Sequence, residues 1–117
     1  MARVRATAKG KAVSKIYVLK DPFTHDVRYV GVTSKALTER LRQHIYCATR
    51  QGGRGGKTPR DRWIRKLAKS GVSPVIEILE TVTGEWQERE IYWIKYHKTY
   101  GSKLTNATIG GMGVKRK

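Results

Sequence analysis

The sequence predicts a single domain of the α+β (α/β) class, in which short strands and amphipathic helices share one modest core. Runs rich in Val, Ile, Leu and Tyr are separated by segments whose apolar residues recur at helical spacing, and these two periodicities are typical of strands and helices. The chain has 117 residues, of which 38% are hydrophobic and 9% aromatic. This is enough for one core and argues against wholesale disorder.

The first predicted element is a β-hairpin between Lys15 and Gly31. Its strands, KIYVLK and VRYVG, flank a turn that contains Pro and Asp, which is typical of a hairpin. The apolar residues suit a sheet with one buried face. Each strand carries a tyrosine, Tyr17 or Tyr29, and the pairing of antiparallel strands can bring the two phenols together. Tyrosines in strands are more often half-buried sheet aromatics, so both interpretations stay open.

A helix is predicted next over residues 33–48, with Thr33 or Ser34 as its N-cap. Its Leu and Ile residues recur every four positions, so that one face packs inward. Arg40 and His44 are also four residues apart and lie along the flank of this apolar stripe, half-buried near the sheet. A guanidinium and an imidazole can together bind a phosphate, although such residues on a helix flank are more often ordinary surface groups.

A basic region follows this helix. Residues 50–60 hold four glycines and four basic residues, and we expect a mobile loop that orders on nucleic acid. Residues 61–70 are predicted to form a short helix that begins near Asp61 and stops at Gly71. The basic residues of the loop and this helix are the best candidates for DNA phosphate contacts. They are Arg54, Lys57, Arg60, Arg62, Arg65, Lys66 and Lys69.

A third strand is predicted over residues 73–82, and a helix over residues 83–97 that begins at Thr83 or Gly84. A helical wheel places Glu90 in the middle of the apolar face of this helix. A carboxylate is costly in such a position unless it is paired or holds a metal. A buried hydrogen bond to Arg or Tyr and a metal site are therefore the two alternatives.

The formal net charge of +16, from 25 basic and nine acidic residues, indicates a polyanionic partner, most often nucleic acid. Cys47 is the single cysteine, which excludes a disulfide framework. The three histidines lack zinc-motif spacing. We expect no secretory signal, no transmembrane segment and no membrane partner. An intracellular, cytoplasmic location fits these features.

Taken in order, these motifs resemble the GIY-YIG nuclease family over roughly residues 14–113. The resemblance rests on the ordered set, because each piece alone is weak. Lys15 departs from the family pattern, since it stands where the family usually has the first glycine of its name. The matching elements in chain order are I-Y-V, ten residues, Y-V-G, Arg40, His44, Glu90 and Asn106 followed by ATIGGMG.

The resemblance implies a small three-stranded antiparallel sheet flanked by helices, and a metal-dependent endonuclease that hydrolyses DNA phosphodiester bonds. Glu90 would hold one Mg²⁺ (or Mn²⁺) ion per active site, and Asn106 would orient Glu90 or a water. Arg40 would stabilise the phosphate in the transition state, and His44 would assist proton transfer or contact the phosphate. One hairpin tyrosine would activate the attacking water, with Tyr17 the first choice; the basic surroundings are expected to lower its pKa from about 10.

The implied organisation is a flexible basic arm (residues 1–12), a nuclease domain (13–113) and a basic tail (114–117). The partner is double-stranded or branched DNA. Because the catalytic module fills the chain, specificity is left to the loop at residues 50–60, to a homodimer or to a partner protein. Two further hypotheses are a non-catalytic nucleic-acid-binding module of the same fold and a basic structural protein of an RNA–protein assembly. Neither needs the whole set of candidate site residues.

Overall fold

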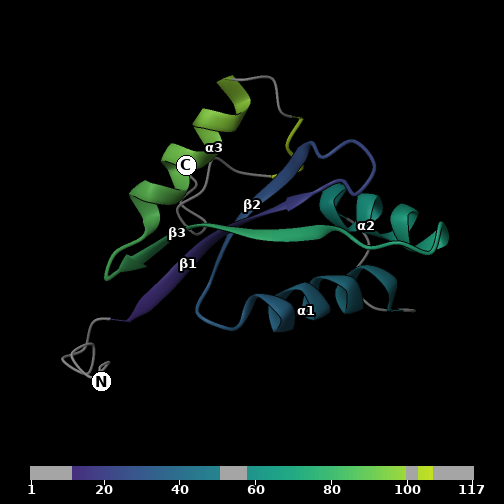
Figure 1. The fold of residues 1–117 in the computed structure, drawn as a ribbon, viewed down its shortest axis with the longest axis horizontal. Coiled ribbons are helices and arrows are strands. Elements are labelled where there is room, and N and C mark those ends of the chain that lie inside the picture. The colour runs from purple at the N-terminus through teal and green to yellow at the C-terminus, as the bar shows by residue number, and fades with distance from the viewer. Residues whose placement is uncertain (1–11, 51–57, 100–102, 107–117) are drawn as a thin grey trace.

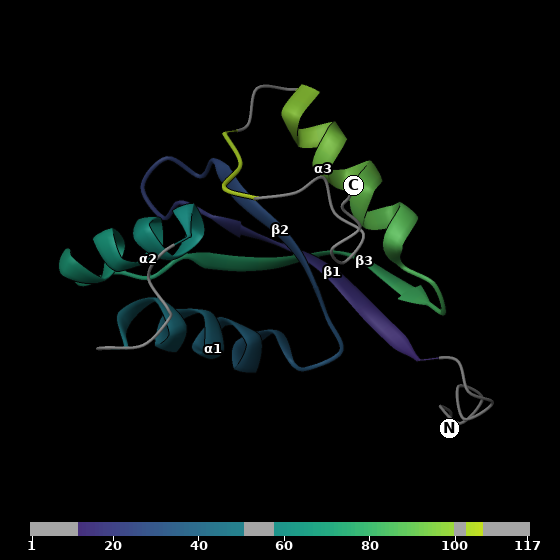
Figure 2. The ribbon, with the colours of Figure 1, turned by 180° about the vertical axis from the view of Figure 1, so that it is seen from behind.

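A three-stranded antiparallel sheet forms the centre of the fold, with helices on both of its faces (Figure 1). The strands β1 (Val13–Lys20), β2 (Val27–Thr33) and β3 (Val75–Thr83) are arranged in the order β2-β1-β3. The helices are α1 (Leu37–Thr49), α2 (Pro59–Lys69) and α3 (Gln87–Thr99). Helices α1 and α2 cover one face and α3 covers the other, as Figure 2 also shows from behind. The predicted α+β class is confirmed.

This computed structural model describes residues 12–50, 58–99 and 103–106. The predicted basic arm and basic tail, and most of the glycine-rich loop, lie outside these described residues. Across the described ranges, no helix is both long enough and apolar enough to span a membrane.

The central strand β1 is buried on both faces. Ile16, Tyr17, Val18 and Leu19 are each no more than 1% exposed. Side chains of a strand alternate between its two faces, and accordingly Tyr17 and Leu19 pack with α1 and α2 while Ile16 and Val18 pack with Ile94 of α3. The expected sheet with one buried face is therefore wrong for β1, because its central place between two helical layers leaves neither face to solvent.

The register of the hairpin brings its two tyrosines together diagonally. Tyr17 is paired with Gly31, and Leu19 is paired with Tyr29. The rings of Tyr17 and Tyr29 are tilted at 48° with centroids 6.3 Å apart. Diagonal neighbours on one face of a sheet lie within reach of aromatic side chains, so the two phenols meet although they are not directly opposite.

Helices α1 and α3 begin three to four residues later than the sequence predicts. The expected N-cap residue Thr33 is the last residue of β2, where it pairs with Lys15, and Thr83 is the last residue of β3, where it pairs with Val13. Both threonines are therefore part of the sheet. Strand pairing outweighs the preference of threonine for the N-cap position of a helix. Helix α2, in contrast, has a side-chain cap, since Thr58 accepts a hydrogen bond from the backbone N–H of Asp61 at 3.1 Å.

The outer edge of β2 is covered by residues 103–106. The backbone N–H of Thr105 donates to the carbonyl of Arg28 at 2.6 Å. Asn106 accepts from the backbone N–H of Val30 at 3.0 Å and donates through Nδ2 to the Val30 carbonyl at 2.8 Å. The Asn106 side chain therefore replaces a neighbouring strand for Val30, and it protects an exposed sheet edge.

We expect Asn106→Ala to lower the free energy of unfolding by about 1–3 kcal/mol, because the N–H and carbonyl of Val30 would lose both partners. Urea denaturation measures this change, and hydrogen exchange of the Val30 amide should accelerate in parallel. Asn106→Asp is the matched control, since it retains the acceptor and removes the donor. Unchanged exchange at Val30 in Asn106→Ala would contradict the clamp.

Candidate active site

A buried hydrogen bond joins the sheet to α1 at the centre of the candidate site. The hydroxyl of Tyr17 lies 2.6 Å from Nε2 of His44, and the two residues are 0% and 2% exposed. Arg40, one turn before His44 on α1, donates through Nε to the Tyr17 hydroxyl oxygen at 3.2 Å. A buried phenolic proton requires an acceptor, and His44 Nε2 lies where that acceptor is needed. We infer that Tyr17 donates to a neutral imidazole, whose own proton is then on Nδ1.

Tyr29 forms the other side of this group and links it to α2. Its ring makes an edge contact with His44, with centroids 5.5 Å apart. Arg60 of α2 donates through an Nη to the Tyr29 hydroxyl at 3.3 Å, and its guanidinium lies over the Tyr29 ring at 5.1 Å. Arg60 also forms an ion pair with Asp61 at 3.4 Å. Two phenols, one imidazole and two guanidiniums thus converge from four separate elements.

Gly31 makes this convergence possible. A Cβ at this position would lie 2.6 Å from Cζ and from the hydroxyl of Tyr17, and 2.7 Å from Cε2 of Tyr29. Contacts below 3.0 Å require atoms to move, so only glycine allows both rings to pack over the backbone of β2. A glycine inside a strand often marks such a close approach. This sequence signal could have assigned Gly31 a role.

Burial sets the protonation states of the two hydrogen-bonded residues. Burial raises the pKa of Tyr17 to about 12, with a further contribution from Tyr29, and Arg40 and Arg60 only partly oppose it. Burial together with the positive charges of Arg40 and Arg60 lowers the pKa of His44 to about 3. The expectation that nearby cations lower the pKa of Tyr17 is wrong, because desolvation of a phenolate outweighs the attraction of the guanidiniums.

Glu90 lies on α3, on the opposite face of the sheet from Tyr17 and His44 (Figure 1). Its predicted position on the apolar face is confirmed, since it is 9% exposed and lies one turn from the buried Ile94. Among the described residues, no three His, Cys, Asp or Glu side chains form a metal cluster. A single carboxylate still fits Mg²⁺, which commonly binds one or two protein carboxylates and completes its shell with water and substrate phosphate.

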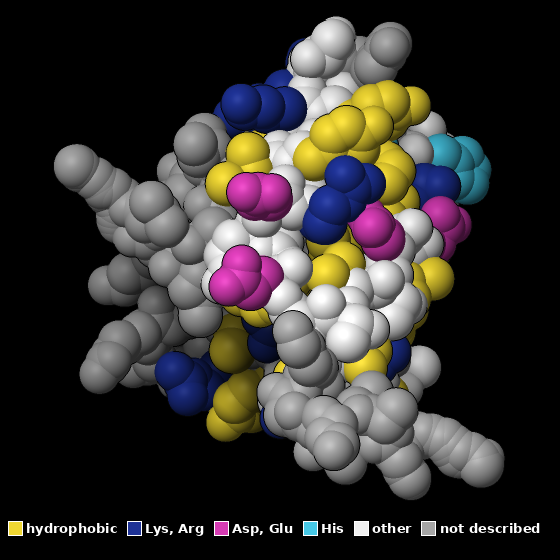
Figure 3. Space-filling model, turned by 90° about the vertical axis from the view of Figure 1, so that its left-hand side faces the viewer, with side chains coloured by type: hydrophobic (Ala, Val, Ile, Leu, Met, Phe, Trp, Pro, Cys, Tyr) yellow, Lys and Arg dark blue, Asp and Glu magenta, His cyan; other side chains and the backbone are white. Residues whose placement is uncertain are grey.

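Two acidic side chains of β3, Glu77 and Glu80, have basic or aromatic partners. Glu80 accepts from Nε of Arg89 and from Nε1 of Trp93, both at 2.9 Å, and these hydrogen bonds hold its pKa below the ordinary value. Glu77 is paired with Lys20 at 3.3 Å. Figure 3 shows acidic, basic and hydrophobic side chains mixed on the side of the molecule that lies at the left in Figure 1. Glu90 is the buried acid of this side among the described residues.

The structure therefore brings four of the six predicted catalytic residues into contact and places two elsewhere. Tyr17, Tyr29, Arg40 and His44 form one group. The predicted role of Asn106 in orienting Glu90 or a water is not what its hydrogen bonds show, because its amide oxygen and nitrogen both bond the backbone of Val30.

The predicted DNA-contacting residues divide into three groups. Arg54 and Lys57 lie outside the described residues. Arg60 is half-buried against Tyr29 and belongs to the tyrosine–histidine group. The sequence pattern does not reveal this contact, because the two residues are 31 positions apart. The remaining residues lie on α2, where three are exposed and Arg65 donates to the carbonyl of Ala48 at 3.3 Å. The exposed three are Arg62, Lys66 and Lys69.

Comparison with known proteins identifies no family for this chain. No protein-family model matches it, and neither the curated proteins nor the solved structures contain a match.

Gly31→Ala tests the close approach of the two tyrosine rings. We expect it to lower the free energy of unfolding by about 1–3 kcal/mol, since the added methyl group must displace a buried ring. Thermal or urea unfolding gives this value, and near-ultraviolet circular dichroism reports the tyrosine environment. Gly71→Ala is the comparison variant, because Gly71 has a φ of +78° but no atom within 4 Å of an added Cβ. An unchanged tyrosine spectrum in Gly31→Ala would contradict the packing.

The protonation of His44 should make stability depend on pH. In the unfolded chain this imidazole titrates near its ordinary pKa of about 6.5, whereas in the folded protein its pKa is about 3. Protons therefore bind the unfolded state preferentially between these values, and stability falls as pH falls through this range by up to about 1.4 kcal/mol per pH unit. Urea unfolding at several pH values measures the slope. The slope should be shallower in His44→Gln, and an identical slope in that variant would contradict the assignment.

Proposed function

We propose that this protein is a metal-dependent DNA endonuclease of the GIY-YIG type that hydrolyses phosphodiester bonds. The observation that carries the proposal is the contact of Tyr17 with His44 and Arg40, three residues that the motif order selects and that come from distant positions in the chain. The net charge of +16 supports a nucleic acid substrate. The proposal includes a cytoplasmic, intracellular protein that acts on double-stranded or branched DNA, alone or with a second copy or a partner.

In this mechanism Tyr17 acts as a relay. The phenolic oxygen takes a proton from the attacking water while its own proton passes to Nε2 of His44 along the 2.6 Å hydrogen bond. A phenolate is never formed, which matters because the pKa of Tyr17 is about 12. The new P–O bond forms as the bond to the leaving oxygen breaks, and that oxygen takes a proton from solvent water. The imidazolium then returns a proton to the phenol oxygen, and the phenolic proton is released to solvent.

Binding of the phosphate adjusts the basicity of His44. Arg40 and Arg60 contribute to the low pKa of this imidazole through their positive charge. A phosphate diester that binds the guanidiniums brings a negative charge, which offsets theirs and raises the pKa of His44 towards the range useful for a proton acceptor. Arg40 also stabilises the additional negative charge that develops on the phosphoryl oxygens.

Glu90 is the residue proposed to hold the divalent ion. A bound Mg²⁺ or Mn²⁺ supplies stabilisation of phosphate charge. Glu90 and the tyrosine–histidine group lie on opposite faces of the sheet, so the substrate must bind where both layers are accessible. Strand β2 is the element that both layers share, because α3 packs against β2 and the Tyr17 ring lies over Gly31 in that strand.

Nicking of supercoiled plasmid tests the proposal. We expect cleavage in Mg²⁺, none with chelator, and a loss of at least about 100-fold in Glu90→Gln, which keeps the volume of the side chain and removes its charge. Glu88→Gln is the matched control, since Glu88 is an exposed acid of the same helix. Normal cleavage by Glu90→Gln would contradict the metal assignment.

One observation favours the second candidate, a non-catalytic nucleic-acid-binding module. Tyr17 is completely buried and its hydroxyl bonds both His44 and Arg40, as expected for a structural group in a core. Under this alternative the protein binds DNA tightly in a gel-shift assay and nicks no plasmid with any divalent ion. Binding would then be unaffected by chelator.

A further inference from the structure

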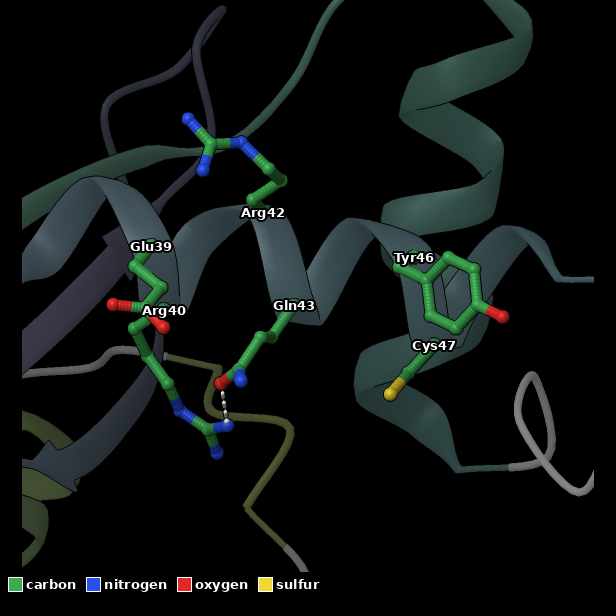
Figure 4. A pocket seen from close by; sticks show the side chains of 6 residues that line it. All are labelled: Glu39, Arg40, Arg42, Gln43, Tyr46 and Cys47. Carbon is green, nitrogen blue, oxygen red and sulfur yellow. Dashed lines mark hydrogen bonds between the residues drawn. The ribbon is translucent and has the colours of Figure 1, made fainter. Parts of the chain in front are cut away.

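A shallow groove of about 660 Å³ runs along α1 (Figure 4). All the side chains that line it come from α1. They are Glu39, Arg40, Arg42, Gln43, Tyr46 and Cys47.

Arg40 connects this groove to the tyrosine–histidine group. Its Nε donates to the hydroxyl oxygen of Tyr17 at 3.2 Å, while one Nη donates to Oε1 of Gln43 at 3.1 Å inside the groove (Figure 4). The Arg40 guanidinium therefore contacts both the tyrosine–histidine group and the groove. A phosphate bound by Arg40 at the active site would therefore have its neighbouring nucleotide at the groove.

Tyr46 gives the groove an aromatic surface. It is 61% exposed, and the guanidinium of Arg50 lies 5.6 Å from the centroid of its ring. An exposed tyrosine beside an arginine is a typical platform for a nucleic acid base, which gains stacking and cation–π contacts. The apolar core does not explain this ring, because the buried residues of α1 are His44 and Ala48.

The charge of the groove also suits nucleic acid. Arg40 and Arg42 line it, and Arg50 lies beside it. Its one acidic side chain, Glu39, is paired with Lys35 at 3.7 Å. In proteins that bind single-stranded nucleic acid, positive side chains contact the phosphates and aromatic rings stack on the bases.

We propose that the groove binds an unpaired nucleotide next to the reacting phosphate, with its base stacked on Tyr46 and its phosphate on Arg42. The inference rests on the proposed function and specifies its substrate class. Bases inside a duplex are already stacked on one another, so Tyr46 is available only to a base that is single-stranded or extruded. The preferred substrate is therefore DNA with an unpaired nucleotide at the cleavage position.

The single cysteine of the chain provides a direct probe. Cys47 is free, exposed and part of the groove lining. The rate of its alkylation by iodoacetamide is measured by mass spectrometry in the presence of chelator, so that no cleavage occurs. Two DNA probes are compared at saturation, a short perfect duplex and the same duplex with one unpaired thymidine.

We expect the probe with the unpaired thymidine to slow alkylation of Cys47 about tenfold more than the perfect duplex does, with a similar preference in affinity. Tyr46→Ala should abolish the difference between the probes, and Tyr46→Phe should retain it. Tyr92→Ala, which removes an exposed tyrosine of α3 on the other face, should also retain it. Equal protection by both probes, or the same behaviour in Tyr46→Ala as in the parent protein, would overturn the inference.

Cleavage of the same two DNA probes in Mg²⁺, measured beside plasmid nicking, separates the two proposals. Selective protection of Cys47 without cleavage of either probe or of the plasmid would support the groove and reject the cleavage activity. Nicking in Mg²⁺ without selective protection would reject the groove and leave the cleavage activity supported.

Discussion

The buried hydrogen bond between Tyr17 and His44 is the interaction on which the candidate site depends. It places a phenol and an imidazole, at 0% and 2% exposure, between the central strand and α1. Two polar groups in such a place are tolerated only when each satisfies the other. The constraint extends to the backbone, because Gly31 must lack a side chain for the Tyr17 ring to reach this position. This one hydrogen bond therefore joins β1 to α1, and it requires a glycine at position 31 of β2.

The sheet separates two chemical environments. On the side of α1 and α2, arginines surround the tyrosine–histidine group, and exposed basic residues continue along α2. On the side of β3 and α3, five of the nine acids of the chain occur between Glu77 and Glu90. Under the proposed function, nucleic acid would bind the first side, where the basic side chains gather. The groove on α1 lies on the first of these sides, while Glu90 of α3 lies across the sheet from it.

The sequence predicted the number, order and type of the elements because its periodicities are clear, and it predicted the burial of Glu90 because a helical wheel fixes which face a residue occupies. It could not predict that Tyr17 pairs with Gly31, since register depends on the turn and on the opposite strand. The roles of Arg60 and Asn106 could not be predicted from the sequence either. Arg60 contacts Tyr29 and Asn106 contacts Val30, and each of these partners lies far away in the chain. The pKa of Tyr17 was predicted in the wrong direction because charge can be counted in a sequence, whereas desolvation depends on packing.

In the proposed proton relay, Tyr17 donates its proton to a neutral His44. NMR of the imidazole nitrogens of His44, followed from neutral pH downwards, tests this assignment. We predict that Nδ1 carries the proton, that Nε2 is an unprotonated acceptor, and that the ring stays neutral until the pH approaches about 3. A ring that is protonated at Nε2 at neutral pH, or that titrates near the ordinary histidine pKa of about 6.5, would contradict it.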